Sequence, residues 1–301
     1  MIRSAVLAVT ERSVTKKMIT DTAVGRAVAR RFVAGDNLES AIAVARELTA
    51  KGMRVSLDHL GEHVSEIAEA TAARDSYLAC LGQISEHDLD ANISIKLTQL
   101  GMGIDSDIAA CHLDEIASAA LVSGTTVTVD MEESVHTQTT VDLYATAQET
   151  HGNLGIAVQS YLRRTADDLD RLIPLGGRIR LCKGAYAEPV TVAYQSGDEV
   201  DASFDRLGAV LMESAGVNVA VASHDDARLE KILAAAERRD EPWEFQMLYG
   251  VRRDRQAELV AMGHQVRVYL PYGEAWYPYL TRRMAERPAN LFFFMRALVG
   301  R

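Results

Sequence analysis

Four side chains near the end of this 301-residue chain combine an aromatic ring, two guanidiniums and a carboxylate. At spacings of i, i+3, i+4 and i+7, the following residues share one face of a predicted helix: Tyr279, Arg282, Arg283 and Glu286. Two neighbouring guanidiniums can hold a small carboxylate through paired hydrogen bonds. The pattern is equally typical of a solvent-exposed face with an i, i+4 ion pair. Both interpretations stay open on these residues alone.

A second set of polar residues stands at the ends of short, β-branched segments. These segments predict strands at residues 53–59, 92–97, 126–130, 155–159, 178–183, 217–223, 243–248 and 265–270. At or near their ends lie Asp58, His59, Lys96, Asp130, Gln159, Lys183, Ser223, His224, Gln246 and Tyr269, and Arg180 lies within the fifth segment. One polar residue at a strand end is ordinary, but recurrence at nearly every strand indicates a shared site.

The elements that must position these residues alternate regularly along the chain. Longer helical patterns separate the strands, for example at residues 63–84, 107–124 and 225–239. The strands are almost continuously apolar, as is typical of parallel strands covered by helices. Eight successive βα units predict an α/β fold, a (β/α)8 barrel of the TIM type, with an open doubly wound sheet as the alternative. In a barrel, the polar residues at the strand ends would face one mouth.

The chain is expected to form one domain with additional N-terminal helices. Residues 1–50 are predicted to form a helical segment packed on the barrel, with Gly35 as a helix stop, and residues 51–301 the catalytic barrel. A hydrophobic content of 48% is sufficient for a large core.

Composition excludes several classes of function. A formal net charge of −10 without a long basic run argues against nucleic-acid binding. No apolar segment is long enough to span a membrane, so we expect a cytoplasmic protein, at most peripheral on the inner face of the membrane. The three separated cysteines indicate neither a disulfide framework nor a thiolate metal site. His59 and His63 have the spacing of a helical metal pair but lack the HExxH order, so no metal is predicted.

Several longer motifs resemble the proline dehydrogenase family, in its monofunctional bacterial form. They are RLCKGAY, ASHDD, WEFQMLYGVR and VRVYLPYGEAWYPYLTRRMAERPAN, and LDHLGE, ISIKLTQLG and AVQSYLRR extend the resemblance over residues 53–290. The resemblance implies a flavin enzyme that oxidises L-proline to Δ1-pyrroline-5-carboxylate, the first step of proline catabolism towards glutamate. It also implies FAD across the barrel mouth, with proline beside the flavin ring.

The resemblance implies roles for the residues that match the family's substrate site. Arg282 and Arg283 would hold the proline carboxylate, which Lys96 would also face, and Leu248 would supply apolar contact. Around the proline ring would lie Asp130, Tyr186, Tyr269 and Tyr279. The catalytic set is therefore Lys96, Asp130, Tyr186, Tyr269, Tyr279, Arg282 and Arg283.

A further group of residues matches the family's cofactor site. Gln159 and Arg180 would hydrogen-bond the flavin ring, and Gly184 and Ala185 permit close backbone approach. The predicted cofactor-binding set is Gln159, Arg180, Lys183, Gly184, Ala185, His224, Gln246 and Glu286, of which Glu286 would also orient the arginine pair. Cys182 and Ser160 are small departures from the family pattern. Gly197 and Asp198 stand where the resemblance leads us to expect a basic residue near the FAD phosphates. The sequence therefore does not identify the residues that bind the AMP half of FAD.

The chemistry of amine oxidation agrees with this assignment. Removing a hydride from the carbon beside nitrogen requires a cofactor, because no side chain accepts a hydride. Lys96, Arg282 and Arg283 would place three cations around one carboxylate. Such a cluster would repel itself as a purely structural feature, so an anionic ligand explains it better.

Two other functions remain possible. A Schiff-base aldolase would use Lys96 or Lys183 as its nucleophile, and a binding module would capture an amino acid without turnover. The resemblance implies a membrane quinone as electron acceptor. The sequence leaves open the oligomeric state, the physiological acceptor, and tolerance of hydroxyproline or other cyclic amino acids.

Overall fold

The computed structural model describes residues 29–286, with side chains as far as residue 281. Eight parallel strands form a closed barrel in chain order, and β1 pairs with β8. The strands are β1 (Arg54–His59), β2 (Ala91–Ile95), β3 (Val127–Val129), β4 (Leu154–Gln159), β5 (Arg178–Cys182), β6 (Asn218–Ala222), β7 (Trp243–Leu248) and β8 (Val266–Tyr272). The predicted (β/α)8 barrel is confirmed, and the doubly wound alternative is wrong because the sheet has no open edge.

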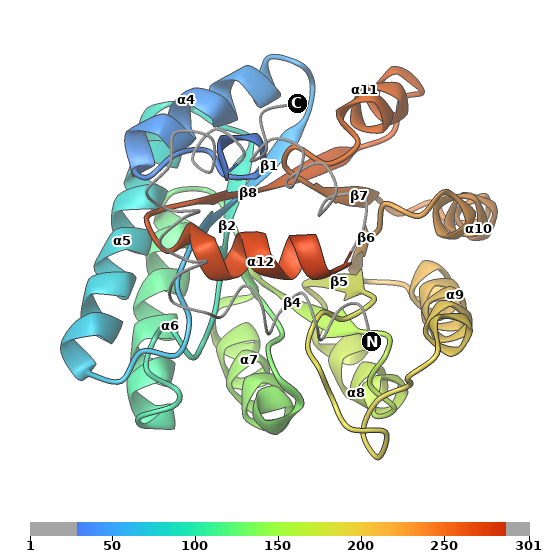
Figure 1. Ribbon diagram of the computed structural model, residues 1–301, viewed down its shortest axis with the longest axis horizontal. Coiled ribbons are helices and arrows are strands. Elements are labelled where there is room, and N and C mark those ends of the chain that lie inside the picture. Colours follow the sequence, from blue (N-terminus) through green and yellow to red (C-terminus); the bar gives the residue numbers. More distant parts are fainter. Residues whose placement is uncertain (1–28, 287–301) are drawn as a thin grey trace, which may run out of the picture.

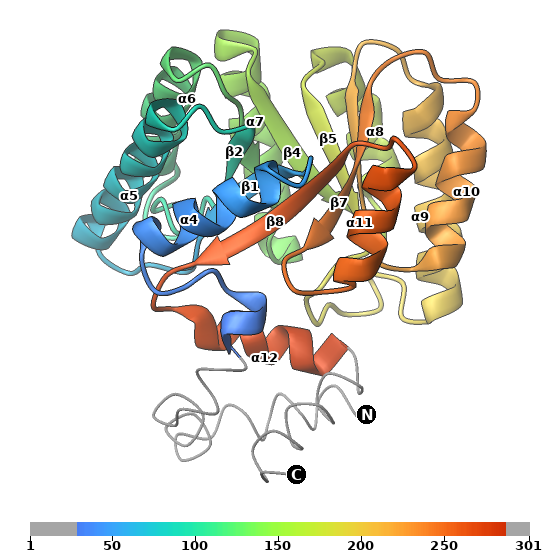
Figure 2. The same cartoon turned by 90° about the horizontal axis from the view of Figure 1, so that it is seen from above.

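Helices surround the barrel on its outside (Figure 1). They are α4 (Leu38–Thr49), α5 (Ile67–Glu86), α6 (Ser106–Val122), α7 (Thr137–His151), α8 (Thr165–Leu172), α9 (Gly197–Glu213), α10 (Asp226–Ala236), α11 (Arg253–Ala261) and α12 (Trp276–Glu286), with 3-10 turns η1 (Ser134–His136) and η2 (Ile173–Leu175). Helix α12 departs from this ring and lies across the barrel mouth, beyond the ends towards which the strands point (Figures 1 and 2).

The interior of the barrel is polar, unlike the branched apolar layers that usually fill this fold. Ser56 and Ser94 face each other at 3.1 Å between their hydroxyl oxygens, and Arg180 donates through Nη2 to Ser94 at 2.8 Å. On the other face of the strands, residues such as Ile93 and Val219 are buried against the helices. The apolar core therefore lies between the strands and the helices, whereas hydrogen-bonded and charged side chains lie along the barrel axis.

The chain before the barrel is tied to the last strand. Residues 29–32 are helical, and the segment that follows runs alongside the end of β8. Ala34 donates its backbone N–H to the carbonyl of Pro271 at 2.8 Å, and Gly273 donates to the carbonyl of Gly35 at 2.9 Å. Gly35 has a φ of 110°, which suits glycine, but it lies three residues after the helical residues end at Phe32, so the predicted helix stop at Gly35 is displaced from the observed end. Helix α4 then packs on β1 and β8.

Candidate functional site

Five side chains from different strands meet at the carboxyl end of the barrel. We call them the Asp130 cluster: Asp58, Lys96, Asp130, Arg180 and Tyr269. Lys96 Nζ lies 2.9 Å from Asp58 Oδ1 and 3.4 Å from Asp130 Oδ2. Arg180 Nη1 lies 2.5 Å from Asp130 Oδ1, and the Tyr269 hydroxyl donates to Asp130 Oδ2 at 2.6 Å. Asp58 is the penultimate residue of β1, whereas Lys96 and Asp130 follow β2 and β3 directly, so the barrel itself brings these groups together.

The Asp130 cluster balances two cations with two carboxylates. Burial favours the neutral form of Lys96, but Asp58 and Asp130 outweigh burial and raise the pKa of its ammonium. Burial likewise opposes the charge of Arg180, yet Asp130 keeps its pKa raised. Burial, and then the charge of Asp130, raise the pKa of Tyr269 well above its ordinary value. At neutral pH the cluster therefore presents two cationic donors and a neutral phenol.

This charge balance changes two interpretations of the sequence. The predicted self-repulsion among Lys96 and the two arginines is absent at Lys96, because two protein carboxylates neutralise it. A lysine held as its ammonium is also a poor nucleophile, which argues against Lys96 as a Schiff-base residue. Asp58 is a site residue that the sequence interpretation left unassigned. Its place at a strand end was the available signal, but its partner could not be known before the barrel closed.

Two glutamines flank the cluster with defined amide orientations. Gln159, at the end of β4, donates through Nε2 to the carbonyl of Met131 at 3.2 Å. Its Oε1 is buried and has no hydrogen-bond partner among the described residues. Gln246 accepts from Arg180 Nε and donates through Nε2 to Glu244 Oε1 at 2.7 Å. Gln159 thus offers an unused acceptor at the mouth, whereas both ends of the Gln246 amide already have a protein partner.

The segment after β5 approaches a buried tyrosine too closely for a side chain. Gly184 has a φ of 113°, and a Cβ there would lie 2.2 Å from Cδ1 of Tyr161. Both the backbone conformation and the space therefore require glycine at this position. Ala185 and Tyr186 follow it and are half-buried.

Gly184→Ala is expected to lower the free energy of unfolding by about 2–4 kcal/mol, combining left-handed backbone strain with displacement of the Tyr161 ring. Urea unfolding measures the change. Gly197→Ala is the matched control, because nothing lies within 4 Å of a Cβ there and the residue opens α9. The control should be neutral or stabilising by about 0.4–1 kcal/mol. Equal effects in both variants would contradict the steric assignment.

Two further predicted cofactor residues, Lys183 and His224, follow β5 and β6 at the mouth. His224 accepts through Nε2 from the backbone N–H of Leu248 at 2.9 Å, which fixes its ring over the end of β7. Lys183 Nζ lies 2.5 Å from Asp201 and 2.8 Å from Asp225. An ammonium carries three donors, so Lys183 keeps one beyond these two ion pairs.

The predicted helix that carries the arginine pair is present as α12. Tyr279 is 5% exposed and Leu280 is fully buried, so the face that begins at Tyr279 is not a solvent-exposed one at this position. The side chains of Arg282, Arg283 and Glu286 lie outside the described residues, and their roles stay predictions.

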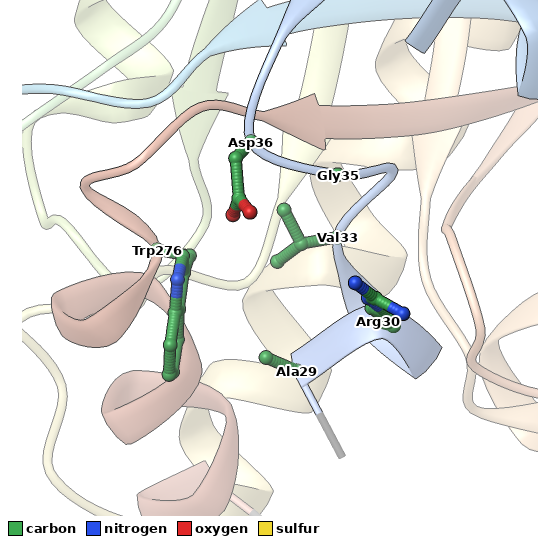
Figure 3. Close-up of a pocket in the computed structure, with 6 residues that line it drawn as sticks. All are labelled: Ala29, Arg30, Val33, Gly35, Asp36 and Trp276. Atoms are coloured by element: carbon green, nitrogen blue, oxygen red, sulfur yellow. The ribbon is translucent and has the colours of Figure 1, made fainter. Parts of the chain in front are cut away.

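A small hollow separates the start of α12 from the N-terminal segment (Figure 3). Figure 3 shows Trp276 on one side and the segment around Val33 and Asp36 on the other. None of its lining residues belongs to the predicted site: Ala29, Arg30, Val33, Gly35, Asp36 and Trp276. The hollow therefore shares no residue with the Asp130 cluster or with the predicted site. No helix within residues 29–286 is long and apolar enough to cross a membrane.

Comparison with known proteins shows the family to which the chain belongs. The family model described as proline dehydrogenase matches residues 41–296. Proline dehydrogenase 1 of Bacillus subtilis is 38% identical over 274 residues, which cover 90% of each chain. Proline dehydrogenase of Deinococcus radiodurans is 36% identical over 308 residues, covering 99% of this chain and 98% of that protein.

A solved structure shares the same barrel. Proline utilization A (PutA) from Bdellovibrio bacteriovorus, inactivated by N-propargylglycine, superposes with a TM-score of 0.81 at 24% identity. The match covers 87% of this chain and 33% of the PutA chain, and it supports the fold. The family model and the curated relatives each span most of the sequence. The chain therefore belongs to the proline dehydrogenase family, oxidoreductases that act on the CH–NH group of proline in proline catabolism.

Proposed function

We propose that this protein oxidises L-proline to Δ1-pyrroline-5-carboxylate, with FAD as the hydride acceptor and with proline bound under α12. The observation that carries the proposal is the Asp130 cluster, a buried set of charged donors and acceptors at the barrel mouth of a proline dehydrogenase family member. Amine oxidation needs such a site, because the amino acid must be held by both of its charged groups while one C–H bond faces the acceptor.

The residues at the mouth fit a flavin. The unused Oε1 of Gln159 is an acceptor that a ring N–H of a flavin can satisfy, since flipping this amide would lose the bond to Met131. We assign cofactor binding to Gln159, Arg180, Lys183, Gly184, Ala185, His224, Gln246 and Glu286. When bound, FAD supplies the hydride acceptor that no side chain provides.

The chain's own residues bind and orient the substrate in this proposal. Arg282 and Arg283 hold the proline carboxylate from above, and Lys96 faces it from the barrel. The contacts of Lys96 with Asp130 and Tyr269 are both 3.4 Å long, so a carboxylate can replace them at small cost while the 2.9 Å pair with Asp58 persists. Asp130 and Tyr269 lie beside this position, and Tyr186, Tyr279 and Leu248 enclose the ring.

The physiological electron acceptor in this proposal is a membrane quinone, reached by peripheral association on the inner face of the membrane. This part rests on family membership alone. Stopped-flow reoxidation of the proline-reduced enzyme by a soluble quinone and by oxygen compares the two acceptors directly. Reoxidation by oxygen at an equal or higher rate would indicate an oxidase instead.

Adding L-proline anaerobically to the purified protein is expected to bleach a flavin absorbance band. The reason is that hydride transfer from proline reduces bound FAD, and without oxygen the reduced form accumulates. The measurement is a visible spectrum before and after addition, with D-proline as the control. A colourless protein that takes up no FAD would favour the aldolase alternative. A yellow protein that proline does not bleach would favour the binding module.

A further inference from the structure

The rim of the barrel mouth carries three side chains of the kind that bind metal ions. His63 belongs to the loop after β1, Glu133 precedes η1, and His136 ends η1. One ligand atom from each lies within 4.8 Å of the other two. The residue that the sequence paired with His63 is directed elsewhere, because the ring of His59 packs against Tyr272 at 5.3 Å between centroids.

The separation of the first two ligand atoms matches a shared ion. His63 Nε2 lies 3.3 Å from Glu133 Oε1. Zinc holds nitrogen and oxygen ligands at roughly 2.0–2.1 Å in tetrahedral geometry, which places two ligands about 3.3–3.4 Å apart. The rings of His63 and His136 have centroids 6.2 Å apart, so a small side-chain rotation aims both nitrogens at one point.

The loop that carries His63 is fixed before any ion binds. His63 adopts a φ of 55°, a left-handed conformation that a non-glycine residue holds only when its surroundings impose it. Its backbone N–H donates to Thr98 Oγ1 at 3.1 Å, and the N–H of Thr98 donates to Glu132 Oε1 at 3.1 Å. Glu132 is 1% exposed and immediately precedes Glu133. The loop after β1 is therefore linked to the loop after β3 through Thr98 and the buried carboxylate of Glu132.

The loop that carries the other two ligands is held in a similar way. His136 donates its N–H to the carbonyl of Glu133 at 2.9 Å, and Ser134 donates its N–H to Glu188 Oε1 at 2.7 Å. Among the described side chains, which end at residue 281, the buried Oε2 of Glu133 has no hydrogen-bond partner. A buried acceptor left in this state costs free energy, and a cation beside the carboxylate would remove that cost.

We propose that His63, Glu133 and His136 bind a divalent transition-metal ion, best matched by Zn²⁺, which links the loop after β1 to the loop after β3. Two imidazoles and one carboxylate suit zinc and its neighbours in the first transition row, whereas magnesium and calcium prefer oxygen ligands throughout. His63 is 46% exposed on its side chain, so water can complete the coordination. The ion would brace the rim beside the Asp130 cluster and takes no part in hydride transfer.

Calorimetric titration of the full chain, after chelator treatment, with Zn²⁺ alone tests the proposal. One site of micromolar or tighter affinity is expected, and Mg²⁺ should give no binding. The variants His63→Asn, Glu133→Gln and His136→Ala should each weaken zinc binding by at least about tenfold. Asparagine is chosen at His63 because it tolerates the left-handed backbone. His87→Ala is the control, since His87 is an exposed histidine at the end of α5.

Thermal unfolding supplies a second readout that does not depend on activity. Zinc should raise the unfolding midpoint of the wild-type protein and of His87→Ala, and should leave His136→Ala unchanged. The same midpoint without zinc shows whether each variant is folded. Zinc affinity that survives in all three ligand variants, or that is lost equally in the control, would overturn the assignment. So would an absence of binding at millimolar zinc, which would leave only the ion pair of His63 with Glu133.

Discussion

Replacing Glu244 by glutamine is expected to lower the free energy of unfolding by about 3–5 kcal/mol at neutral pH, because it leaves buried guanidiniums without an anionic partner. Glu244 is 4% exposed inside the amino end of the barrel. Arg267 Nε lies 2.7 Å from its Oε1, and Arg178 Nε lies 3.6 Å from the same atom. Arg54 approaches Oε2 at 3.5 Å. One carboxylate therefore serves three arginines, and no other carboxylate is paired with Arg267 or Arg178 among the described ion pairs.

Urea unfolding of Glu244→Gln measures this loss. The matched control is Glu237→Gln, an exposed glutamate beyond α10 whose substitution should change stability by less than about 0.5 kcal/mol. A loss at Glu244 no larger than that of the control would show that the arginines are adequately solvated or held by other groups. Because Arg267 also donates to the carbonyl of Val55, its side chain should stay in place in the variant.

The same carboxylate gives the stability a defined dependence on pH. Burial alone would raise the pKa of Glu244, but Arg267 and Arg178 outweigh burial and lower it from 4.5 to about 2. The folded protein therefore binds this proton more weakly than the unfolded chain does. The contribution of Glu244 is fully present above pH 4.5 and is lost as the pH falls towards about 2. Glu244→Gln should flatten the unfolding free energy in this window relative to the wild-type protein.

Glu244 also determines the orientation of Gln246 and Arg180, which belong to the proposed cofactor site. A carboxylate only accepts hydrogen bonds, so Gln246 must turn its Nε2 towards Glu244 and its Oε1 towards Arg180. Arg180 is then aimed at Asp130. In Glu244→Gln the new amide can donate, which removes this restriction on Gln246. A structural change at the amino end of the barrel thereby reaches the proposed active site.

The strands and the mouth of the barrel were predictable because they depend on local patterns. Runs such as 154–159 are rich in apolar and β-branched residues, and polar residues such as Gln159 and Lys96 end or follow the strands. A closed parallel barrel places every strand end at one mouth, so the composition of the site followed from the fold. Helix α12 was predictable for the same reason, since its side-chain spacing is a local property of the chain.

The pairing inside the barrel could not be predicted from such patterns. Lys96 meets Asp58, 38 residues before it, and Arg180 meets Ser94, 86 residues before it. The relative register of neighbouring strands decides which inward-facing groups meet. In β1 and β2, for example, the register pairs Asp58 with Ser94. Sequence therefore identified Lys96 as a cation at the mouth but gave no indication that two carboxylates already compensate it.

Lys96→Met is expected to destabilise the protein by about 3–5 kcal/mol and to abolish most of its proline oxidation, for two separable reasons. The first is structural, because Asp58 loses the ammonium at 2.9 Å. Asp58 is 1% exposed on its side chain, and its Oδ2, which Lys96 does not contact, has no hydrogen-bond partner in the described part of the chain. Asp130 is less affected, since Arg180 and Tyr269 still bind it.

Adding Asp58→Asn to Lys96→Met separates this structural effect from catalysis. Asparagine has nearly the same shape as aspartate but lacks the unpaired negative charge of Asp58, so the double variant should regain most of the lost stability. Its catalytic efficiency should stay low, because the proposed contact between the ammonium and the proline carboxylate is still missing. Loss of a buried charged contact costs about 2–5 kcal/mol, which corresponds to roughly thirty-fold to several-thousand-fold in kcat/KM.

The measurements are urea unfolding and steady-state proline oxidation of both single variants and the double variant, with FAD content checked in each. Normal kcat/KM in the double variant would restrict Lys96 to a structural role, and unrecovered stability would show that Asp58 is not the group that Lys96 neutralises.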